Sequence, residues 1–248
     1  MRIAALYDIH GNVPALDAVL ADVEREGVDV VVWGGDVAAG PMPADTLERM
    51  RAVGGPCVMG NGDRQMVEDF DAGRTPSDSD DEMMRTMLWA VSRIDRSDRD
   101  FLAAFAPTVS LDVDGLGPTL FCHGSPRGDE ERITRATPDE RLAPMLEGVD
   151  ERVIVCGHTH QQFDLRCGEQ RVLNAGSIGM PYEGTAAAFW LLLGPDAELR
   201  RTEYDVPAAV ETMRASRMPD VYRVLLQESL IEPADPDWVT NYFETGRE

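Results

Sequence analysis

The fold is decided by the stretch Val153-Ile154-Val155-Cys156-Gly157-His158-Thr159-His160. Four apolar or small residues that suit a buried strand run into a glycine, and two histidines follow two positions apart. On an extended segment, side chains at i and i+2 leave the backbone on the same side, so we expect both imidazoles to reach one point beyond the strand. Imidazole is the commonest protein metal ligand. By itself, the pair leaves both a metal site and a chance arrangement open.

The other two histidines of the chain have the same setting, an apolar run followed by polar residues. Residues 2–7 precede Asp8-Ile9-His10, and residues 119–122 precede His123. Two more apolar runs, 28–33 and 56–59, precede Gly34-Gly35-Asp36 and Gly60-Asn61. Ligands of open α/β sheets collect outside the carboxyl ends of strands. These polar side chains are therefore predicted to converge on one crevice.

The rest of the chain alternates between helical and strand patterns, which predicts an α/β fold. Helices are expected over residues 14–26, 43–52 and 138–147, and strands over 109–113, 119–122, 162–166, 171–173, 187–193 and 198–204. Hairpin spacings in the second half indicate a second sheet. A helical insertion is expected near residues 64–106, with methionines that we assign to its core, and a C-terminal helical segment at about 207–231, followed by a loosely held tail. No linker separates these parts, so residues 1–248 are predicted to form one domain.

The composition excludes several classes of partner. The chain has 23 basic residues, all arginine, against 45 acidic residues, giving a net charge of −22. Such a surface repels polymeric nucleic acid and anionic membranes. The four cysteines show no paired spacing and no apolar run approaches membrane-spanning length. We expect reduced thiols, no leader peptide, and a cytoplasmic protein.

The strand-end side chains form a mixed oxygen and nitrogen set: Asp8, His10, Asp36, Asn61, His123, His158 and His160. This chemistry suits Mn, Fe, Zn or Co better than Mg or Ca, which prefer oxygen ligands. Seven ligands are too many for one open site, and they suit two ions that share a bridging carboxylate. The set therefore predicts a dinuclear metal centre.

In chain order, these motifs read Asp-x-His, Gly-Asp, Gly-Asn, His and Gly-His-x-His. With this order of motifs, residues 1–205 resemble the calcineurin-like metallophosphoesterase family. The resemblance is to its small bacterial-type phosphodiesterases in particular. The resemblance implies a two-sheet sandwich flanked by helices. It also implies two divalent transition metal ions, Mn favoured over Fe, Zn, Co or Ni. Asp8, His10 and His160 would hold the first ion, Asn61, His123 and His158 the second, and Asp36 would bridge both. A metal-bridging hydroxide would then attack phosphorus.

One motif departs from the family pattern. The family usually has Gly-Asn-His, in which the histidine is thought to protonate the leaving group, but this chain has Gly60-Asn61-Gly62-Asp63. Without that acid, good leaving groups are favoured, so we expect a small phosphodiester or phosphoanhydride, nucleotide-like, as substrate. Asp63 is expected to anchor the loop, with a role as substitute acid as the alternative.

Other assignments stay open. Arg127 is expected either to clamp a phosphate oxygen at the catalytic site with Asp36 and Asn61, or to pair with Asp129 or Glu130 on the surface. A phosphomonoesterase and a non-catalytic protein-binding scaffold are the alternative functions. The C-terminal segment is expected to pack on the sheet, with a homo-oligomer interface as the alternative.

Overall fold

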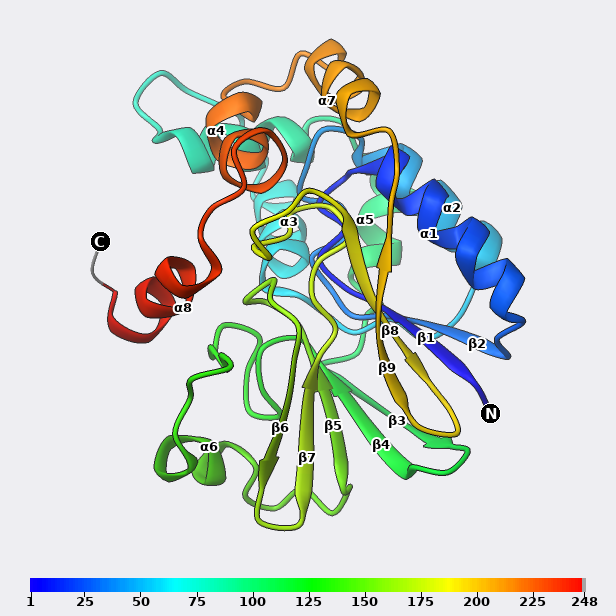
Figure 1. Cartoon of the computed structure of the whole chain (residues 1–248). Helices are drawn as coiled ribbons and strands as arrows, with labels where there is room; N and C mark the ends of the chain where they lie inside the picture. The colour runs from blue at the N-terminus through cyan, green and yellow to red at the C-terminus, as the bar shows by residue number, and fades with distance from the viewer. Residues whose placement is uncertain (247–248) are drawn as a thin grey trace.

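Two β-sheets pack against each other in the computed structural model, which describes residues 1–246 apart from the side chains of residues 222 and 223 (Figure 1). The first sheet has the order β2-β1-β8-β9, with bounds Val30–Trp33, Ile3–Leu6, Ala188–Leu193 and Ala197–Thr202. The second has the order β3-β4-β5-β7-β6, with bounds Thr108–Val113, Gly117–Cys122, Val153–Cys156, Gln170–Asn174 and Phe163–Cys167. Strand β1 is parallel to β2, and β5 is parallel to both β4 and β7. The predicted two-sheet α/β fold is confirmed.

The central strands are apolar throughout because both of their faces are covered. In β1, Ile3 and Ala5 belong to the core between the sheets, whereas Ala4 and Leu6 belong to the core under the helices. Successive side chains on a strand point to opposite faces, so burial on both sides requires an unbroken apolar run. Strands β1, β5 and β8 are buried at every position for this reason.

Helices cover the outer faces of the sandwich. Helices α1 (Val13–Glu26) and α2 (Pro43–Val53) lie beside the first sheet, and α6 (Asp139–Met145) lies beside the second (Figure 1). Helix α1 begins after Asn12, whose Oδ1 accepts a hydrogen bond from the Ala15 N–H at 3.2 Å. It ends at Gly27, which has the left-handed φ of 62° that glycine adopts without steric cost. Asn12 therefore shapes the turn after β1.

The helical insertion consists of α3 (Asn61–Asp71), α4 (Glu82–Val91) and α5 (Arg96–Leu102). It begins three residues earlier than predicted, because the Asp63 carboxylate accepts the Gly60 N–H and caps α3 at once. The strand predicted over residues 56–59 is wrong. Only isolated bridges form there, Trp33 with Cys57 and Val58 with Ala106, because the chain turns into α3 after one pair on each side.

The C-terminal segment differs from the prediction in two ways. The helix expected over 207–231 is divided into α7 (Val206–Ala215) and a π-helix, η1 (Tyr222–Ile231), and between them Arg217 and Asp220 have left-handed φ values of 61° and 54°. The expected loose tail instead forms α8 (Pro236–Thr245). Ion pairs from Arg135 to Asp237 and from Arg141 to Glu244 attach α8 to the loop and helix before β5.

The cysteines are unpaired, as expected: Cys57, Cys122, Cys156 and Cys167 are all free thiols. Burial raises the pKa of the Cys57 thiol to about 12, with a smaller effect from the charge of Asp63. Across residues 1–246, no helix combines the length and the apolar character needed to cross a bilayer.

Candidate metal centre

The polar turns after β1, β2, β4 and β5 meet at one edge of the sandwich. Backbone hydrogen bonds join them: the Asp8 N–H donates to the Gly35 carbonyl at 3.1 Å, and the His10 N–H donates to the Asp36 carbonyl at 3.0 Å. The Gly157 N–H donates to the His123 carbonyl at 2.8 Å. Between the sheets, the His158 N–H donates to Oδ2 of Asp8 at 3.0 Å, so the carboxyl ends of strands from both sheets form one rim.

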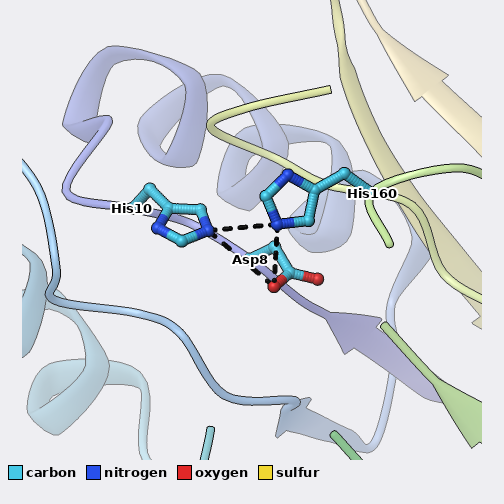
Figure 2. Close-up of side chains that lie close together, drawn as sticks. All are labelled: Asp8, His10 and His160. Carbon is cyan, nitrogen blue, oxygen red and sulfur yellow. Dashed lines mark hydrogen bonds and ion pairs between the residues drawn. The ribbon is translucent and has the colours of Figure 1, made fainter. Parts of the chain in front are cut away.

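A first group of potential metal ligands contains Asp8, His10 and His160, whose ligand atoms all lie within 4.8 Å of one another (Figure 2). The Nε2 atoms of His10 and His160 are 3.2 Å apart, and Oδ1 of Asp8 lies 3.9 Å from the former and 3.3 Å from the latter. Figure 2 shows the three side chains pointing at a common centre. One cation placed there would contact all three.

A second group contains Asp36, His123 and His158, again with all ligand atoms within 4.8 Å. Nε2 of His123 lies 3.6 Å from Oδ2 of Asp36 and 3.9 Å from Oδ1 of Asp8, so the two groups are neighbours. Asn61, at the start of α3, lines the same cavity as Asp36 and His158. The structure thus brings together all seven strand-end residues singled out in the sequence.

Backbone carbonyls fix the orientation of three imidazoles. Nδ1 of His10 lies 3.2 Å from the Ala39 carbonyl, Nδ1 of His123 lies 2.9 Å from that of Gly34, and Nδ1 of His160 lies 2.7 Å from that of Met180. A carbonyl oxygen only accepts, so Nδ1 carries the proton in each ring. In the neutral form of each ring, which is the form that binds metal, the lone pair of Nε2 is thereby directed into the centre, as in metal-binding histidines generally.

Unpaired buried atoms support a cation at this centre. Six buried side-chain atoms of the described residues have no hydrogen-bond partner, and three of them lie at this centre: Oδ1 of Asp8, Oδ1 of Asn61 and Nε2 of His123. Leaving such an atom unpaired costs about 1–3 kcal/mol, and more when it is charged. All three belong to the proposed ligand set. Their donor chemistry fits divalent transition metal ions.

The backbone of the site is held in a sparsely populated conformation. Left-handed φ values occur at Asp8 (52°), His10 (47°), Asp36 (51°), His158 (63°) and His160 (57°). Such values cost a non-glycine residue roughly 1–3 kcal/mol each and cluster at functional sites. They also correct one prediction: His158 and His160 are not extended, so they reach two different groups instead of one point.

The carboxylate of Asp36 lies at the N-terminus of α3. Its Oδ1 accepts the Gly62 N–H at 2.7 Å, and the positive end of the helix dipole stabilises the negative charge. Burial favours the neutral acid, but the charges of His123, His10 and His158 hold the pKa of Asp36 far below its usual value. Asp36 is therefore an anionic ligand at neutral pH.

Three imidazoles of the site have clearly shifted pKa values, and the direction of each shift depends on the neighbouring charges. Burial lowers the pKa of His158 to about 4, with repulsion from His123 as the second cause. Burial likewise lowers the pKa of His10, with repulsion from His160. For His123 burial acts in the same direction, but the charges of Asp36 and Asp8 outweigh it and raise its pKa to about 10. These opposite shifts show how strongly the two carboxylates act within the site.

Arg127 does not reach this centre. Its guanidinium pairs with Glu131 and donates to the Pro144 carbonyl at 3.1 Å, and it lines a separate surface depression with Arg64. The surface partners considered for it in the sequence, Asp129 and Glu130, are instead bound by Arg64. The structure thus places Arg127 in a surface ion pair with Glu131, the residue directly after Glu130.

A cavity of about 320 Å³ opens over the two groups, and the sequence did not identify the individual residues of its roof. The insertion contributes Met83, Thr86 and Met87, and the C-terminal segment contributes Met218, Val224 and Leu225. Met83 is 58% exposed, so the assignment of the insertion's methionines to a core is wrong for this residue. The ring of Tyr182 was also missed: it stacks on His160 at 5.2 Å between centroids. No sequence motif marks these contacts, since they depend on how α4 and η1 pack.

Residues 1–193 match the family model of the calcineurin-like phosphoesterase superfamily domain. The chain belongs to this superfamily. Its calcineurin-like phosphoesterase domain carries two Asp/His groups that can each hold a metal ion, as the dinuclear, metal-dependent chemistry of the superfamily requires.

Similar proteins match nearly the whole chain. An uncharacterized protein of Methanocaldococcus jannaschii is 26% identical over 238 residues, covering 88% of this chain and 94% of that protein. The crystal structure of a metallophosphoesterase from Sphaerobacter thermophilus is 25% identical with a TM-score of 0.70, over 89% of this chain and 95% of that one. A hypothetical protein from Pyrococcus horikoshii shares the fold, with a TM-score of 0.77, 18% identity and coverage of 90% and 97%.

Proposed function

We propose that the chain hydrolyses a small phosphodiester or phosphoanhydride, using two divalent transition metal ions, with manganese favoured. Asp8, His10 and His160 would hold one ion, Asn61, His123 and His158 the other, and Asp36 both. When bound, such ions generate a nucleophile from water at neutral pH and neutralise charge on the phosphoryl oxygens. The superfamily and the two Asp/His groups support this assignment.

The choice of a diester or anhydride rests on one observation: Gly62 lines the cavity beside the two groups, where the family pattern has a histidine. Among the described residues that line this cavity, every ionisable side chain is already a proposed metal ligand. A general acid contributes typically ~10²–10⁴ in rate, mostly for poor leaving groups. Without one, the substrate needs a leaving group that departs as an anion, such as a phenolate or a phosphate.

Asp63 does not replace that acid. Burial, with the charge of Asp36, raises its pKa to about 7, which would suit proton transfer. However, its two oxygens accept the N–H groups of Asp36, Val37 and Gly60, and Asp63 does not line the cavity. Its position supports a role in holding the Asp36 loop.

The test combines metal content with hydrolysis. Wild-type protein and the Asp36→Asn variant are loaded with Mn, and bound metal is measured by elemental analysis. Hydrolysis of bis(4-nitrophenyl) phosphate and of 4-nitrophenyl phosphate is then recorded for both proteins. We expect about two ions per wild-type chain, a diesterase rate well above the monoesterase rate, and loss of metal and activity in the variant.

Each other result selects a different function. A monoesterase rate above the diesterase rate would identify a phosphomonoesterase. Absence of metal binding, with no hydrolysis in Mn, Ni, Co or Zn, would overturn the enzymatic proposal and favour a protein-binding scaffold on the same fold.

A further inference from the structure

A second and larger groove lies directly beside the metal-centre cavity. It has a volume of about 700 Å³ and shares three lining residues with that cavity, Met83, Met180 and Val224. Its remaining lining comes from Tyr182 in the loop between β7 and β8, from the start of α4, from η1 and from α8, which lies apart from the two sheets (Figure 1). A molecule with its phosphate at the metal ions can therefore extend into this groove.

Aromatic rings form a continuous series from the metal centre through this groove. Tyr182 stacks on His160 with a 15° angle between the rings, and its centroid lies 6.3 Å from that of Phe243. The Tyr242 ring follows at 5.9 Å from Phe243, and Trp238 stacks on Tyr242 at 5.9 Å and 14°. Trp238 is 43% exposed and Tyr242 is 39% exposed. Both rings are thus partly open to solvent in the groove.

Besides the aromatic rings, carboxylates line this groove. Asp81 and Glu228 line it, and no basic residue is among the described residues that do so. Asp81 accepts the Met84 N–H at 2.8 Å as the cap of α4, which fixes its position at the rim. An anionic group would be repelled here. An organic cation would meet both aromatic faces and opposite charge, the combination that recognises quaternary ammonium groups.

We propose that this groove binds an ammonium group on the substrate, on the ester substituent that remains attached to phosphorus. The inference rests on the proposed phosphodiesterase function and specifies its substrate class. The phosphoryl group would lie at the two Asp/His groups, the leaving group would face the space at Gly62, and the ammonium substituent would extend past Met180 and Tyr182. Substrates with additional phosphates in the groove would be repelled by the carboxylates of Asp81 and Glu228.

The test uses two substrates of equal shape. 4-Nitrophenyl phosphorylcholine carries a trimethylammonium group, and 4-nitrophenyl 3,3-dimethylbutyl phosphate carries an uncharged tert-butyl group in its place. Both release 4-nitrophenolate, so the chemical step is matched. We expect the Mn-loaded enzyme to favour the choline ester in kcat/KM by about ten-fold, the effect of one well-placed cation–π contact with added ion pairing.

Two variants remove a carboxylate and an aromatic ring of the groove, and a third variant serves as the control. Glu228→Gln and Trp238→Leu change exposed residues, so folding is preserved, and each should reduce the ratio of kcat/KM for the choline ester to kcat/KM for the neutral ester at least about three-fold. Glu24→Gln removes an exposed carboxylate from α1 and should retain the full preference. Independently of turnover, choline should quench tryptophan fluorescence in the wild type more than 3,3-dimethylbutanol does, and less so in Glu228→Gln.

The outcomes separate this inference from the proposed function. Hydrolysis of both esters at equal rates, without choline quenching, would overturn the ammonium site and leave the phosphodiesterase standing. Hydrolysis of neither ester, in any of the metals, would overturn the phosphodiesterase, and choline quenching lost in Glu228→Gln would then still support the groove. A preference for the choline ester that survives in both groove variants would overturn the assignment to these residues.

Discussion

Asp63 holds the backbone of Asp36 in place: its Oδ2 accepts the Asp36 N–H at 2.8 Å. The same carboxylate accepts the N–H groups of Val37 at 3.0 Å and Gly60 at 3.3 Å, and Asp63 is fully buried. We expect Asp63→Ala to lower the free energy of unfolding by about 2–4 kcal/mol, because buried N–H groups lose their acceptor. Bound metal should also fall, since Asp36 loses its fixed orientation. Urea unfolding and elemental analysis measure the two effects.

The matched control for this variant is Asp98→Ala. Asp98 is the equivalent capping residue of α5, accepting the Asp95 N–H at 3.2 Å, and it pairs with Arg51 at 2.8 Å. Its loss should cost about 1–2 kcal/mol of stability and leave metal binding unchanged. If both variants lose metal equally, the role of Asp63 is general stabilisation and not positioning of Asp36.

Introducing the histidine of the family pattern, Gly62→His, should broaden the range of leaving groups. A Cβ at Gly62 would lie 3.0 Å from Oδ1 of Asp36 and 3.3 Å from Cβ of Ala39, so both must move slightly. An imidazole at this position can protonate the leaving oxygen. We expect the rate on an alkyl phosphate ester, relative to a 4-nitrophenyl ester, to rise at least about ten-fold.

Gly62→Ala separates the steric effect from the chemical one. The alanine adds the same Cβ without a proton donor, so its rates on alkyl and aryl esters should change by the same factor. Proportional changes in Gly62→His as well would show that leaving-group protonation does not limit the reaction.

The parts of the molecule predicted from the sequence are those set by local pattern. Every residue of the two Asp/His groups follows an apolar run, and parallel strands bring their carboxyl ends together whatever the connections between them. The order of the motifs along the chain indicated the family and the division of the ligands between two metal ions. The two sheets followed from the same runs.

The parts that the sequence did not predict depend on contacts between distant segments. The roof over the metal centre joins α4 to η1, which are more than a hundred residues apart, and nothing in either segment specifies the other. The sequence of α8 alone resembles a polar tail. Its helix is held by ion pairs of its acidic residues with Arg135 and Arg141, which lie about a hundred residues earlier in the chain. The left-handed φ values of His158 and His160 accompany contacts with distant segments that a strand pattern cannot show: the His158 N–H donates to Oδ2 of Asp8, and the His160 carbonyl accepts the Tyr182 N–H.

Single histidine variants should each empty one metal position. His10 belongs to the group with Asp8 and His160, and His158 belongs to the group with Asp36 and His123. We expect His10→Ala and His158→Ala each to bind about one ion instead of two, because losing one ligand typically lowers metal affinity 10-fold or more. Elemental analysis at a fixed, limiting Mn concentration measures this, and each variant controls for the other. Loss of both ions in either variant would show that the positions fill only together.

Glu244 should make the docking of α8 sensitive to acid. Its carboxylate accepts Thr134 Oγ1 at 2.6 Å and Thr137 Oγ1 at 3.0 Å, and it pairs with Arg141. Burial favours its neutral form, but these hydrogen bonds outweigh it and hold the pKa of Glu244 below its ordinary value of 4.5. The ionised form therefore stabilises the fold above pH 4.5, and this contribution disappears as the pH falls through the folded-state pKa.

We accordingly expect Glu244→Gln to lower the free energy of unfolding by about 1–2 kcal/mol at pH 6, and the difference from wild type to shrink towards zero below pH 4. Glu203→Gln is the control, because Glu203 pairs with Arg201 on the surface with 70% of its side chain exposed. Its loss should change stability by less than about 0.5 kcal/mol at any pH. Urea unfolding between pH 3 and 6 measures both differences. A Glu244→Gln effect that stayed constant over this range would mean that side-chain shape, and not the charge of Glu244, attaches α8.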